Sequence, residues 1–431
     1  MWQILHSRTF RSLRHRNYRR YFAGQIISFA GSWMQSAALM WFLFDRTGDP
    51  RWPSWILVAQ VGPTVLLGAW GGSLADRYPR RRVVFWTQSA FLCHALLLAA
   101  LTACHWTWPA LILLLMLLSG VIQAVDLPAR LAFVPELVPR EDLINAVGLN
   151  ALLFNSARAI GPALAALIFL AAEQWVARIG SWGWDAVQTA AVVCFTLNAV
   201  SFVAVLVALQ GIVIDGEQQR RPEAKQSQDL WQGMRYLQHH PRLGLLVFLT
   251  LLLCIFGWPL LTLLPAYTRY HLGRGEQTYS GLLALLGTGA LSGALTTATF
   301  GTAARRRFFL RGGALATTLG LALLTQISSF PGAVLACAAV GFGLILYLST
   351  GQATLQLAAP SEFRGRLMAL WAMTLSASAP LGHLLAGQAA AIWGVTTVLS
   401  GLSCGCALVT IVLWLLPPIG VREDGELDRK A

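Results

Sequence analysis

The chain has 431 residues, of which 56% are hydrophobic and 12% are charged. An average soluble domain carries about 25% charged residues, so this composition excludes a soluble globular fold. The net charge of +13 does not indicate a nucleic-acid surface, because the basic residues alternate with apolar stretches instead of gathering on one face.

Apolar stretches of about 20 residues, the length that crosses roughly 30 Å of hydrocarbon, recur along the chain. Backbone groups in lipid must bond internally, so each stretch is expected to be a helix. We predict an all-α integral membrane protein with two six-helix halves, residues 22–210 and 242–417. The stretches begin near Phe22, Trp52, Val83, Trp106, Leu143, Ala186, Leu243, Thr278, Phe308, Gly332, Leu367 and Thr396.

The basic residues indicate the orientation of the chain. If the N-terminus is cytoplasmic, most of the 32 Lys and Arg residues fall on the inner side. The positive-inside rule then predicts that both termini are cytoplasmic. The remaining basic residues are Arg46, Arg51, Arg178, Arg269 and Arg274 in outer loops, and Arg158 within a span.

Polar segments flank the two halves. Residues 1–21 are expected to form a cytoplasmic lead-in along the membrane surface, 211–241 a cytoplasmic linker between the halves, and 418–431 a cytoplasmic tail. The N-terminal segment lacks a small-residue cleavage site, so no cleaved signal peptide is expected.

Cysteine and lysine usage argues against metal and ATP chemistry. The pair Cys404 and Cys406 has no second pair at metal spacing, so no metal site is expected. A phosphate-binding GxxxxGK[ST] loop needs a lysine in that context, and neither Lys225 nor Lys430 has it. We therefore expect no cofactor and no enzyme activity.

A dense charge cluster, GGSLADRYPRRR from Gly71 to Arg82, separates the second and third spans. An ionised Asp76 can lie against the positive N-terminus of a helix, and the arginines can bind carboxylates on a neighbouring helix. Asp126 on the fourth span is a candidate partner, with Arg130 at i+4 on the same face. Binding of anionic lipid head groups is the alternative. The predicted inner-side latch comprises Gly72, Asp76, Arg77, Arg80, Arg81, Asp126 and Arg130.

This cluster resembles the signature between the second and third helices of the major facilitator superfamily, with Pro79 where a glycine is usual. The resemblance implies two parallel six-helix halves that rock about a central site. A weak internal repeat agrees with it, because a shift of 225 aligns Gly62 with Gly287 and a shift of 221 aligns Gly161 with Gly382. The first shift also aligns Arg80–Arg82 with Arg305–Arg307, but the second copy lacks an acid. The C-terminal half is therefore expected to latch weakly or not at all.

The fifth span contains NSARAIGPALA, from Asn155 to Ala165, which resembles the Gly-Pro motif of drug–proton antiporters. Gly161 allows close helix approach and Pro162 bends the helix; packing alone is the alternative. A charge in hydrocarbon is costly, so Arg158 is expected to face a central cavity, or else to extend outward. Five polar side chains of the first and fifth spans are predicted to bind substrate, or else to join helices: Gln25, Gln35, Asn150, Asn155 and Arg158.

The coupling site is the least defined part of the sequence. No Asp or Glu occupies the middle of a span, where proton-coupled exporters usually carry one. His383 has an ordinary pKa near 6.5, suited to proton exchange, but a plain hydrogen bond between helices is the alternative. Asp45 and Asp126 are the other proton-coupling candidates.

Longer segments, including FRSLRHRNYRRYFAGQ and EFRGRLMALWAM, resemble the branch that contains enterobactin exporters and macrolide efflux proteins. The resemblance implies a secondary active transporter that exports an amphipathic small molecule, drug-like or siderophore-like, by alternating access and with proton coupling. The alternatives are a lysophospholipid or lipid flippase and a non-transporting sensor. The expected partners are a small-molecule substrate, a proton or other coupling ion and membrane lipids, without nucleic acid. The protein is expected to be a monomer in the bacterial inner membrane.

Overall fold

The computed structural model describes residues 8–180, 183–212 and 230–415. Its contacts divide the chain into two compact units, which we call the N-terminal and C-terminal units. The N-terminal unit contains Met1–Gly48, Trp55–Glu223 and Gly275–Ala284. The C-terminal unit contains Asp49–Ser54, Ala224–Arg274 and Leu285–Ala431.

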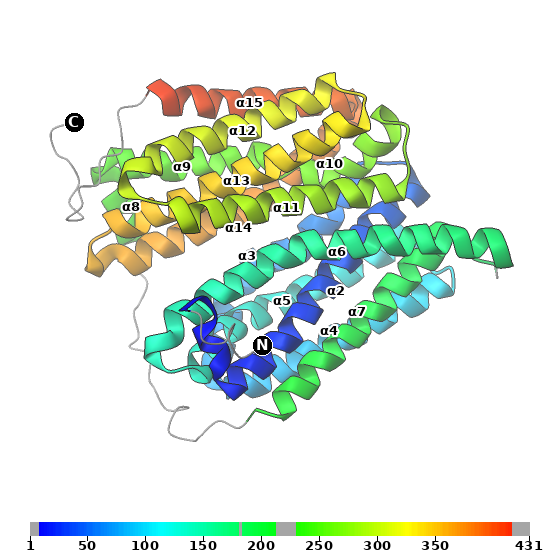
Figure 1. Ribbon diagram of the computed structural model, residues 1–431, viewed down its shortest axis with the longest axis horizontal. Coiled ribbons are helices and arrows are strands. Elements are labelled where there is room, and N and C mark those ends of the chain that lie inside the picture. The colour runs from blue at the N-terminus through cyan, green and yellow to red at the C-terminus, as the bar shows by residue number, and fades with distance from the viewer. Residues whose placement is uncertain (1–7, 181–182, 213–229, 416–431) are drawn as a thin grey trace. The chain divides into compact units, whose positions relative to one another are not determined.

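The first half of the chain forms long helices joined by short turns (Figure 1). Within the N-terminal unit α2 packs against α6 and α7, and α4 packs against α5 and α7. The elements are η1 (Arg8–Arg14), α2 (Arg16–Thr47), α3 (Arg51–Arg77), α4 (Arg80–Ala103), α5 (Pro109–Leu137), η2 (Arg140–Asp142), α6 (Leu143–Ile179) and α7 (Ala186–Gln210).

The second half is built in the same way. Within the C-terminal unit α12 packs against α13 and α15, and α9 packs against α14 and α15. The elements are α8 (Leu230–His239), α9 (Pro241–Gly257), α10 (Leu260–Ala266), η3 (Tyr267–His271), α11 (Glu276–Phe300), η4 (Ala303–Arg305), α12 (Arg306–Gln326), α13 (Phe330–Ala358), α14 (Ser361–Trp393) and α15 (Val395–Leu415).

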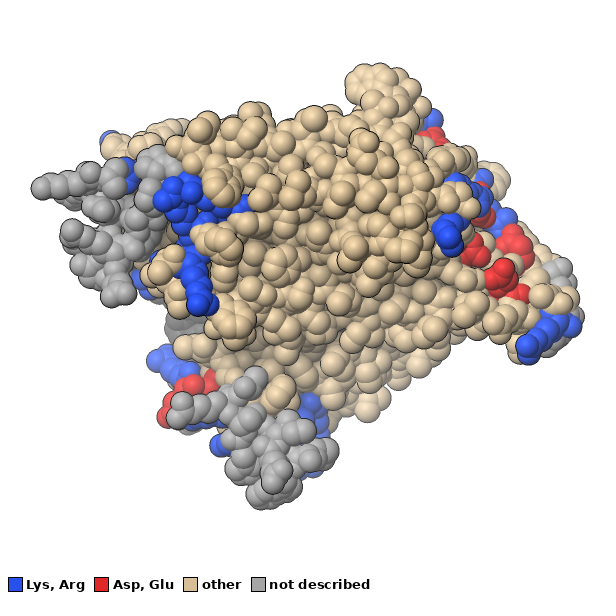
Figure 2. Space-filling model, turned by 45° about the horizontal axis from the view of Figure 1, so that its top comes forward, with Lys and Arg blue, Asp and Glu red and all other residues tan. Residues whose placement is uncertain are grey.

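Twelve helical segments in the described ranges are long and apolar enough to cross a membrane. The prediction of an all-α chain with twelve spans is therefore confirmed. On the face drawn in Figure 2, charged side chains gather near the ends of the helices and leave the surface between them apolar. The predicted tail 418–431 and most of the predicted linker 211–241 lie outside the described residues.

The seventh span is interrupted, which the apolar pattern alone does not reveal. It runs from Pro241 to His271 but consists of α9, α10 and a π-helical turn. Pro259 lies at the start of α10 and Pro265 within it. Because proline has no N–H to donate, each removes a helical hydrogen bond, and the segment divides where these residues occur.

The turn at Pro79 suits a proline. Pro79 precedes α4 with φ at −55°, close to the value that the ring imposes. Its carbonyl accepts hydrogen bonds from the backbone N–H groups of Arg82 (2.8 Å) and Val83 (3.2 Å). A glycine is therefore not required for this helix start.

A glycine of the fourth span approaches the backbone of the second span in each half. A Cβ added to Gly120 on α5 would lie 2.6 Å from the carbonyl oxygen of Gln60, and one added to Gly341 on α13 would lie 1.9 Å from that of Leu286. Such contacts drive helix association in lipid, where burial of apolar surface gains little. Gly120 and Gly341 are separated by 221 residues, the same shift found in the sequence.

An arginine on the third span of each half binds the end of the sixth. Arg81 on α4 donates to the carbonyls of Leu209 (2.9 Å) and Gln210 (3.2 Å) at the end of α7. Arg311 on α12 donates to the carbonyls of Leu413 and Trp414 at the end of α15, both at 2.9 Å. A cation at this position satisfies carbonyls that the helix leaves unbonded and opposes the negative helix end. By its contacts Arg311 corresponds to Arg81, although the sequence repeat aligns Arg81 with Arg306.

Candidate functional site

A buried ion pair lies within the N-terminal unit on α5. Asp126 is 1% exposed, and its Oδ2 lies 2.5 Å from Arg130 Nε. Its Oδ1 accepts hydrogen bonds from Thr87 Oγ1 (2.6 Å) and Gln88 Nε2 (3.0 Å) of α4. Charged groups are buried at such positions only with partners. We call Asp126, Arg130, Thr87, Gln88 and Gln25 the Asp126 network.

Arg130 connects this network to α2. Its Nη1 donates to Gln25 Oε1 at 3.4 Å, and its guanidinium carbon lies 4.7 Å from the centre of the Phe29 ring. Gln25 is 2% exposed. The predicted substrate residue Gln25 and the predicted latch residue Arg130 therefore contact one another.

A second arginine lies against α2 about one turn beyond Phe29. The guanidinium carbon of Arg158 on α6 is 5.3 Å from the centre of the Trp33 ring. The ring of Phe154 lies edge-on to Phe29 and Trp33, with centroids 5.7 and 6.3 Å apart. We call Phe29, Trp33, Phe154, Arg130 and Arg158 the arginine–aromatic cluster. It combines two guanidinium groups with three aromatic rings, groups that suit an anionic or aromatic ligand.

Gly161 and Pro162 explain how α6 reaches α2 at this cluster. A Cβ added to Gly161 would lie 2.5 Å from Trp33 Cβ and 2.7 Å from the carbonyl oxygen of Ala30. Pro162 has no N–H to donate to the carbonyl of Arg158, four residues earlier. The close approach of the helices therefore holds Trp33 beside Arg158.

Two of the other three predicted substrate residues, Gln35 and Asn155, form hydrogen bonds within the protein. Gln35 Oε1 accepts from Asn198 Nδ2 of α7 at 2.8 Å, a contact that joins two helices. Asn155 Nδ2 donates to the carbonyl of Ala151 in its own helix at 2.9 Å. Asn150 is partly exposed on α6. Of the five predicted substrate residues, Gln25 on α2 and Arg158 on α6 thus take part in neighbouring contacts along α2. Gln35 instead bonds to α7.

The predicted latch residues separate into different environments. Asp76 and Arg77 are exposed at the end of α3, and in the described ranges neither forms a hydrogen bond or ion pair. Asp126 has its partners on α4 and α5, so it is not shared with Asp76 in this structure. A Cβ on Gly72 would meet nothing within 4 Å, whereas one on Gly71 would lie 2.1 Å from the carbonyl oxygen of Ala124.

The arginines of the charge cluster bind α5 and α7. Arg80 Nη1 lies 3.2 Å from Glu136 Oε1 and donates to the carbonyl of Ala132 at 3.2 Å. Arg81 binds backbone carbonyls of α7, where the sequence suggested a carboxylate. The sequence could not predict this partner of Arg81, because the acceptors are backbone carbonyls at the end of α7 and not a particular kind of side chain.

The remaining proton-coupling candidates lie elsewhere. His383 on α14 is 1% exposed, and its Nδ1 is 3.0 Å from Thr262 Oγ1 of α10. Asp45 lies near the end of α2 and is partly exposed. Of the three candidates, Asp126 is the one that lies directly against the arginine–aromatic cluster, through Arg130.

Sequence reasoning missed a second buried carboxylate, Asp142, just before α6. Arg11 Nε lies 2.6 Å from its Oδ1 and His15 Nε2 lies 2.7 Å from its Oδ2. Ser12 Oγ donates to the carbonyl oxygen of Asp142 (2.9 Å) and to Asn145 Oδ1 (2.8 Å). The lead-in thus packs against the start of α6. The signal available was the run of Arg, Ser and His facing an acidic helix start.

Replacement of Asp142 by alanine is expected to lower the free energy of unfolding by about 2–3 kcal/mol, because it removes charge-assisted contacts with Arg11 and His15. Thermal unfolding of the purified protein in detergent measures this change. Glu141→Ala is the matched control, since Glu141 is 83% exposed and 3.6 Å from Arg11, and such surface pairs contribute about 0–1 kcal/mol. Equal effects of the two substitutions would contradict the role given to Asp142.

Comparison with known proteins decides the family. A family model described as a transmembrane secretion effector matches residues 7–428, nearly the whole chain. The chain belongs to this family of the major facilitator superfamily. Macrolide efflux protein A of Streptococcus pyogenes is 22% identical to this chain, and the similarity covers 95% of this chain and 96% of the macrolide efflux protein. The multidrug efflux pump Tap of Mycolicibacterium fortuitum is 26% identical, and the similarity covers 90% of this chain and 92% of Tap.

Further similarities agree with this assignment. The staphyloferrin A transporter of Staphylococcus aureus is 28% identical over 34% of the chain and 38% of its own length. Among solved structures, the nucleoside transporter NupG superposes with a TM-score of 0.69 at 13% identity, covering 92% of this chain and 98% of its own. A bacterial homologue of the lysosomal transporter Spinster superposes with a TM-score of 0.70 at 13% identity, covering 92% and 96%. These likenesses confirm the major facilitator fold, and the family consists of transporters.

Proposed function

We propose that this secretion effector family member exports an amphipathic small molecule, drug-like or siderophore-like, by alternating access coupled to proton entry. The relatives that carry out macrolide, multidrug and siderophore transport support this class of substrate. In the proposal both termini are cytoplasmic, the halves 22–210 and 242–417 rock about the binding site, and the protein acts as a monomer in the bacterial inner membrane.

The arginine–aromatic cluster is the observation that carries the substrate assignment. Arg158 is 6% exposed and lies over the Trp33 ring. A buried guanidinium needs an anionic or π partner, and rings bind the flat apolar part of an amphipathic compound. We assign this cluster to substrate binding, with Phe29, Trp33, Phe154 and Arg158 in contact with substrate.

The Asp126 network is the proposed coupling element. Protonation of Asp126 removes the charge that holds Arg130, so proton binding alters the position of Arg130 over Phe29. Protonation of Asp126 thereby changes the charge and position of a side chain at the substrate cluster, and a coupling free energy between the two sites is what linked transport needs. His383 and Asp45 are retained as alternative proton sites.

The test is transport by purified protein in liposomes. A panel of a macrolide, a ferric siderophore and ethidium is presented on the cytoplasmic side, with a proton gradient directed toward that side. Accumulation against the substrate gradient that collapses on adding a protonophore supports the proposal. Movement of lysophospholipid instead of these compounds indicates a lipid flippase, and binding without movement indicates a sensor; either result overturns it.

Within the predicted inner-side latch, the five residues around the α3–α4 turn are proposed to hold the outward-facing state: Gly72, Asp76, Arg77, Arg80 and Arg81. Asp76→Asn is expected to lower the transport rate at least tenfold while membrane insertion is unchanged, because it removes a charge at a helix end and no apolar surface. Transport in vesicles with matched protein content measures this, with Glu141→Gln as an exposed control. A rate equal to that of the unmodified protein would refute the latch.

A further inference from the structure

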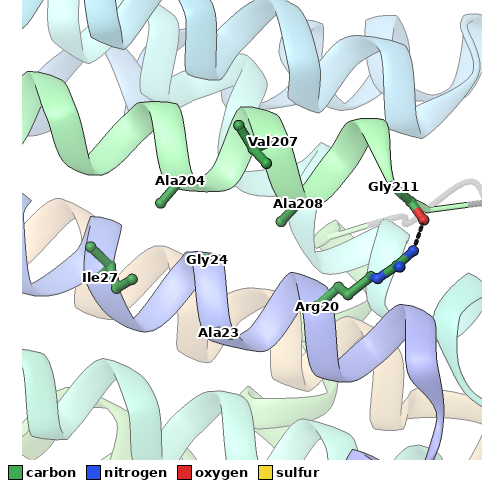
Figure 3. A pocket seen from close by; sticks show the side chains of 8 residues that line it. All are labelled: Arg20, Ala23, Gly24, Ile27, Ala204, Val207, Ala208 and Gly211. Carbon is green, nitrogen blue, oxygen red and sulfur yellow. Dashed lines mark hydrogen bonds between the residues drawn. The ribbon is translucent and has the colours of Figure 1, made fainter.

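A groove of about 610 Å³ runs between α2 and α7 within the N-terminal unit (Figure 3). It forms because the helices approach closely and carry small side chains there. A Cβ added to Gly24 would lie 3.1 Å from Val205 Cα and 3.2 Å from the carbonyl oxygen of Ala204. The lining residues are Arg20, Ala23, Gly24, Ile27, Ala204, Val207, Ala208 and Gly211.

The rim of the groove is exposed and apolar. Ile27 is 52% exposed and Val207 is 61% exposed, and both belong to helices that are candidate membrane spans. A surface of this kind faces hydrocarbon in a bilayer. We therefore expect lipid acyl chains to reach the groove along its apolar length.

One end of the groove carries a concentration of positive charge. Arg20 donates to the carbonyl of Gly211, as Figure 3 shows. Arg81 binds the neighbouring carbonyls of Leu209 and Gln210, and the exposed Arg16 lies one turn before Arg20 on the same helix face. Among the described residues neither Arg20 nor Arg81 forms an ion pair with a carboxylate.

These guanidinium groups retain donors for a ligand. Each guanidinium has five N–H donors in a planar fork, a geometry that matches phosphate oxygens. The hydrogen bonds to backbone carbonyls use Nη1 of Arg20 and both Nε and Nη2 of Arg81. The chemistry that complements this end is a phosphate or other oxyanion.

We propose that the groove binds an anionic phospholipid, with one acyl chain along Ala23, Gly24, Ala204 and Ala208 and the phosphate on Arg20 and Arg81. The distance from Arg20 to Ile27 is seven residues, about 10 Å of helix, so the groove holds part of one chain. An acyl chain that leaves bulk lipid for the groove gains little from apolar contact. Selection therefore depends on the head group, and a negative head group is favoured by about 1 kcal/mol per nearby arginine.

The experiment is native mass spectrometry of the full-length protein, released from micelles that contain equal amounts of phosphatidylglycerol and phosphatidylethanolamine. Arg20→Gln is expected to weaken phosphatidylglycerol binding about fivefold and to weaken phosphatidylethanolamine binding less, because the ammonium of that head group offsets the charge of its phosphate. Arg178→Gln is the matched control, because it removes one exposed arginine from the last turn of α6, a helix that does not line the groove. Ala204→Leu fills the groove and is expected to lower the binding of both lipids.

Arg20→Lys separates charge from folding, since it keeps the positive group and is expected to retain most of the preference for phosphatidylglycerol. Equal losses with Arg20→Gln and Arg178→Gln would overturn the proposal in favour of a diffuse electrostatic effect. The proposal would also be overturned if the unmodified protein had the mass of a dimer and the Ala204→Leu variant had the mass of a monomer. The groove would then be a contact between two copies of the chain. None of these outcomes depends on the identity of the transported compound.

Discussion

Replacement of Asp126 by alanine is expected to lower the free energy of unfolding by about 3–5 kcal/mol and to abolish coupled transport. The reason is that Arg130, whose side chain is 12% exposed, would be left with an uncompensated charge. Thr87 and Gln88 would also lose the acceptor that they share. Thermal unfolding in detergent and transport in liposomes measure the two effects.

Two further variants separate stability from coupling. In the double variant Asp126→Leu with Arg130→Met, both charges are absent, so much of the lost stability should return. Asp126→Asn keeps an acceptor for Thr87 and Gln88 but cannot exchange a proton, so substrate binding and downhill movement should continue while the response to a proton gradient disappears. A gradient-driven rate equal to that of the unmodified protein in Asp126→Asn would remove Asp126 from the coupling mechanism.

The spans and their number followed from the sequence because lipid imposes a simple rule. A charge-free stretch of sufficient length must be helical, and this rule holds whatever the helix contacts. The interruption of the seventh span did not follow from hydropathy, since Pro259 and Pro265 occur within an unbroken apolar run. The proline positions were visible, but whether a proline bends a helix or divides it depends on the neighbouring helices.

The candidate site was predictable only in part. The i+4 spacing of Asp126 and Arg130 placed them on one helix face, and the structure joins them in an ion pair. Their partners Thr87 on α4 and Gln25 on α2 are 39 and 105 residues distant along the chain. Contacts of that separation depend on how helices pack, which the spacing of residues within one helix does not determine.

Backbone partners were the least predictable feature. Arg81 binds carbonyls at the end of α7, and the close contact of α3 is at Gly71, one residue before the predicted Gly72. A shift of one residue rotates a helix position by about 100°, so the motif locates the turn of helix but not the face in contact. The side chains of one helix do not determine which backbone carbonyls of a neighbouring helix lie within hydrogen-bonding distance.

The second large effect is expected at Arg158. Arg158→Ala should weaken binding of an anionic substrate at least thirtyfold, because truncating one partner of a desolvated charge pair costs about 2 kcal/mol or more. Binding of a neutral aromatic compound should change less than threefold, since the rings of Phe29, Trp33 and Phe154 remain. Arg158→Lys keeps the charge but loses the planar contact with Trp33, so an intermediate affinity is expected.

Gly161 provides an independent test of the same cluster, because it contacts Trp33 without offering a charged group. In Gly161→Ala the new Cβ meets Trp33 Cβ and the backbone of Ala30, so α6 must move away from α2 and Arg158 must shift relative to the Trp33 ring. Affinity for both anionic and neutral compounds should then fall. Gly148→Ala on the same helix is the matched control, since its Cβ would meet nothing within 4 Å. Equilibrium binding in detergent compares the variants, and unchanged affinities in both Arg158→Ala and Gly161→Ala would assign the cluster to helix packing.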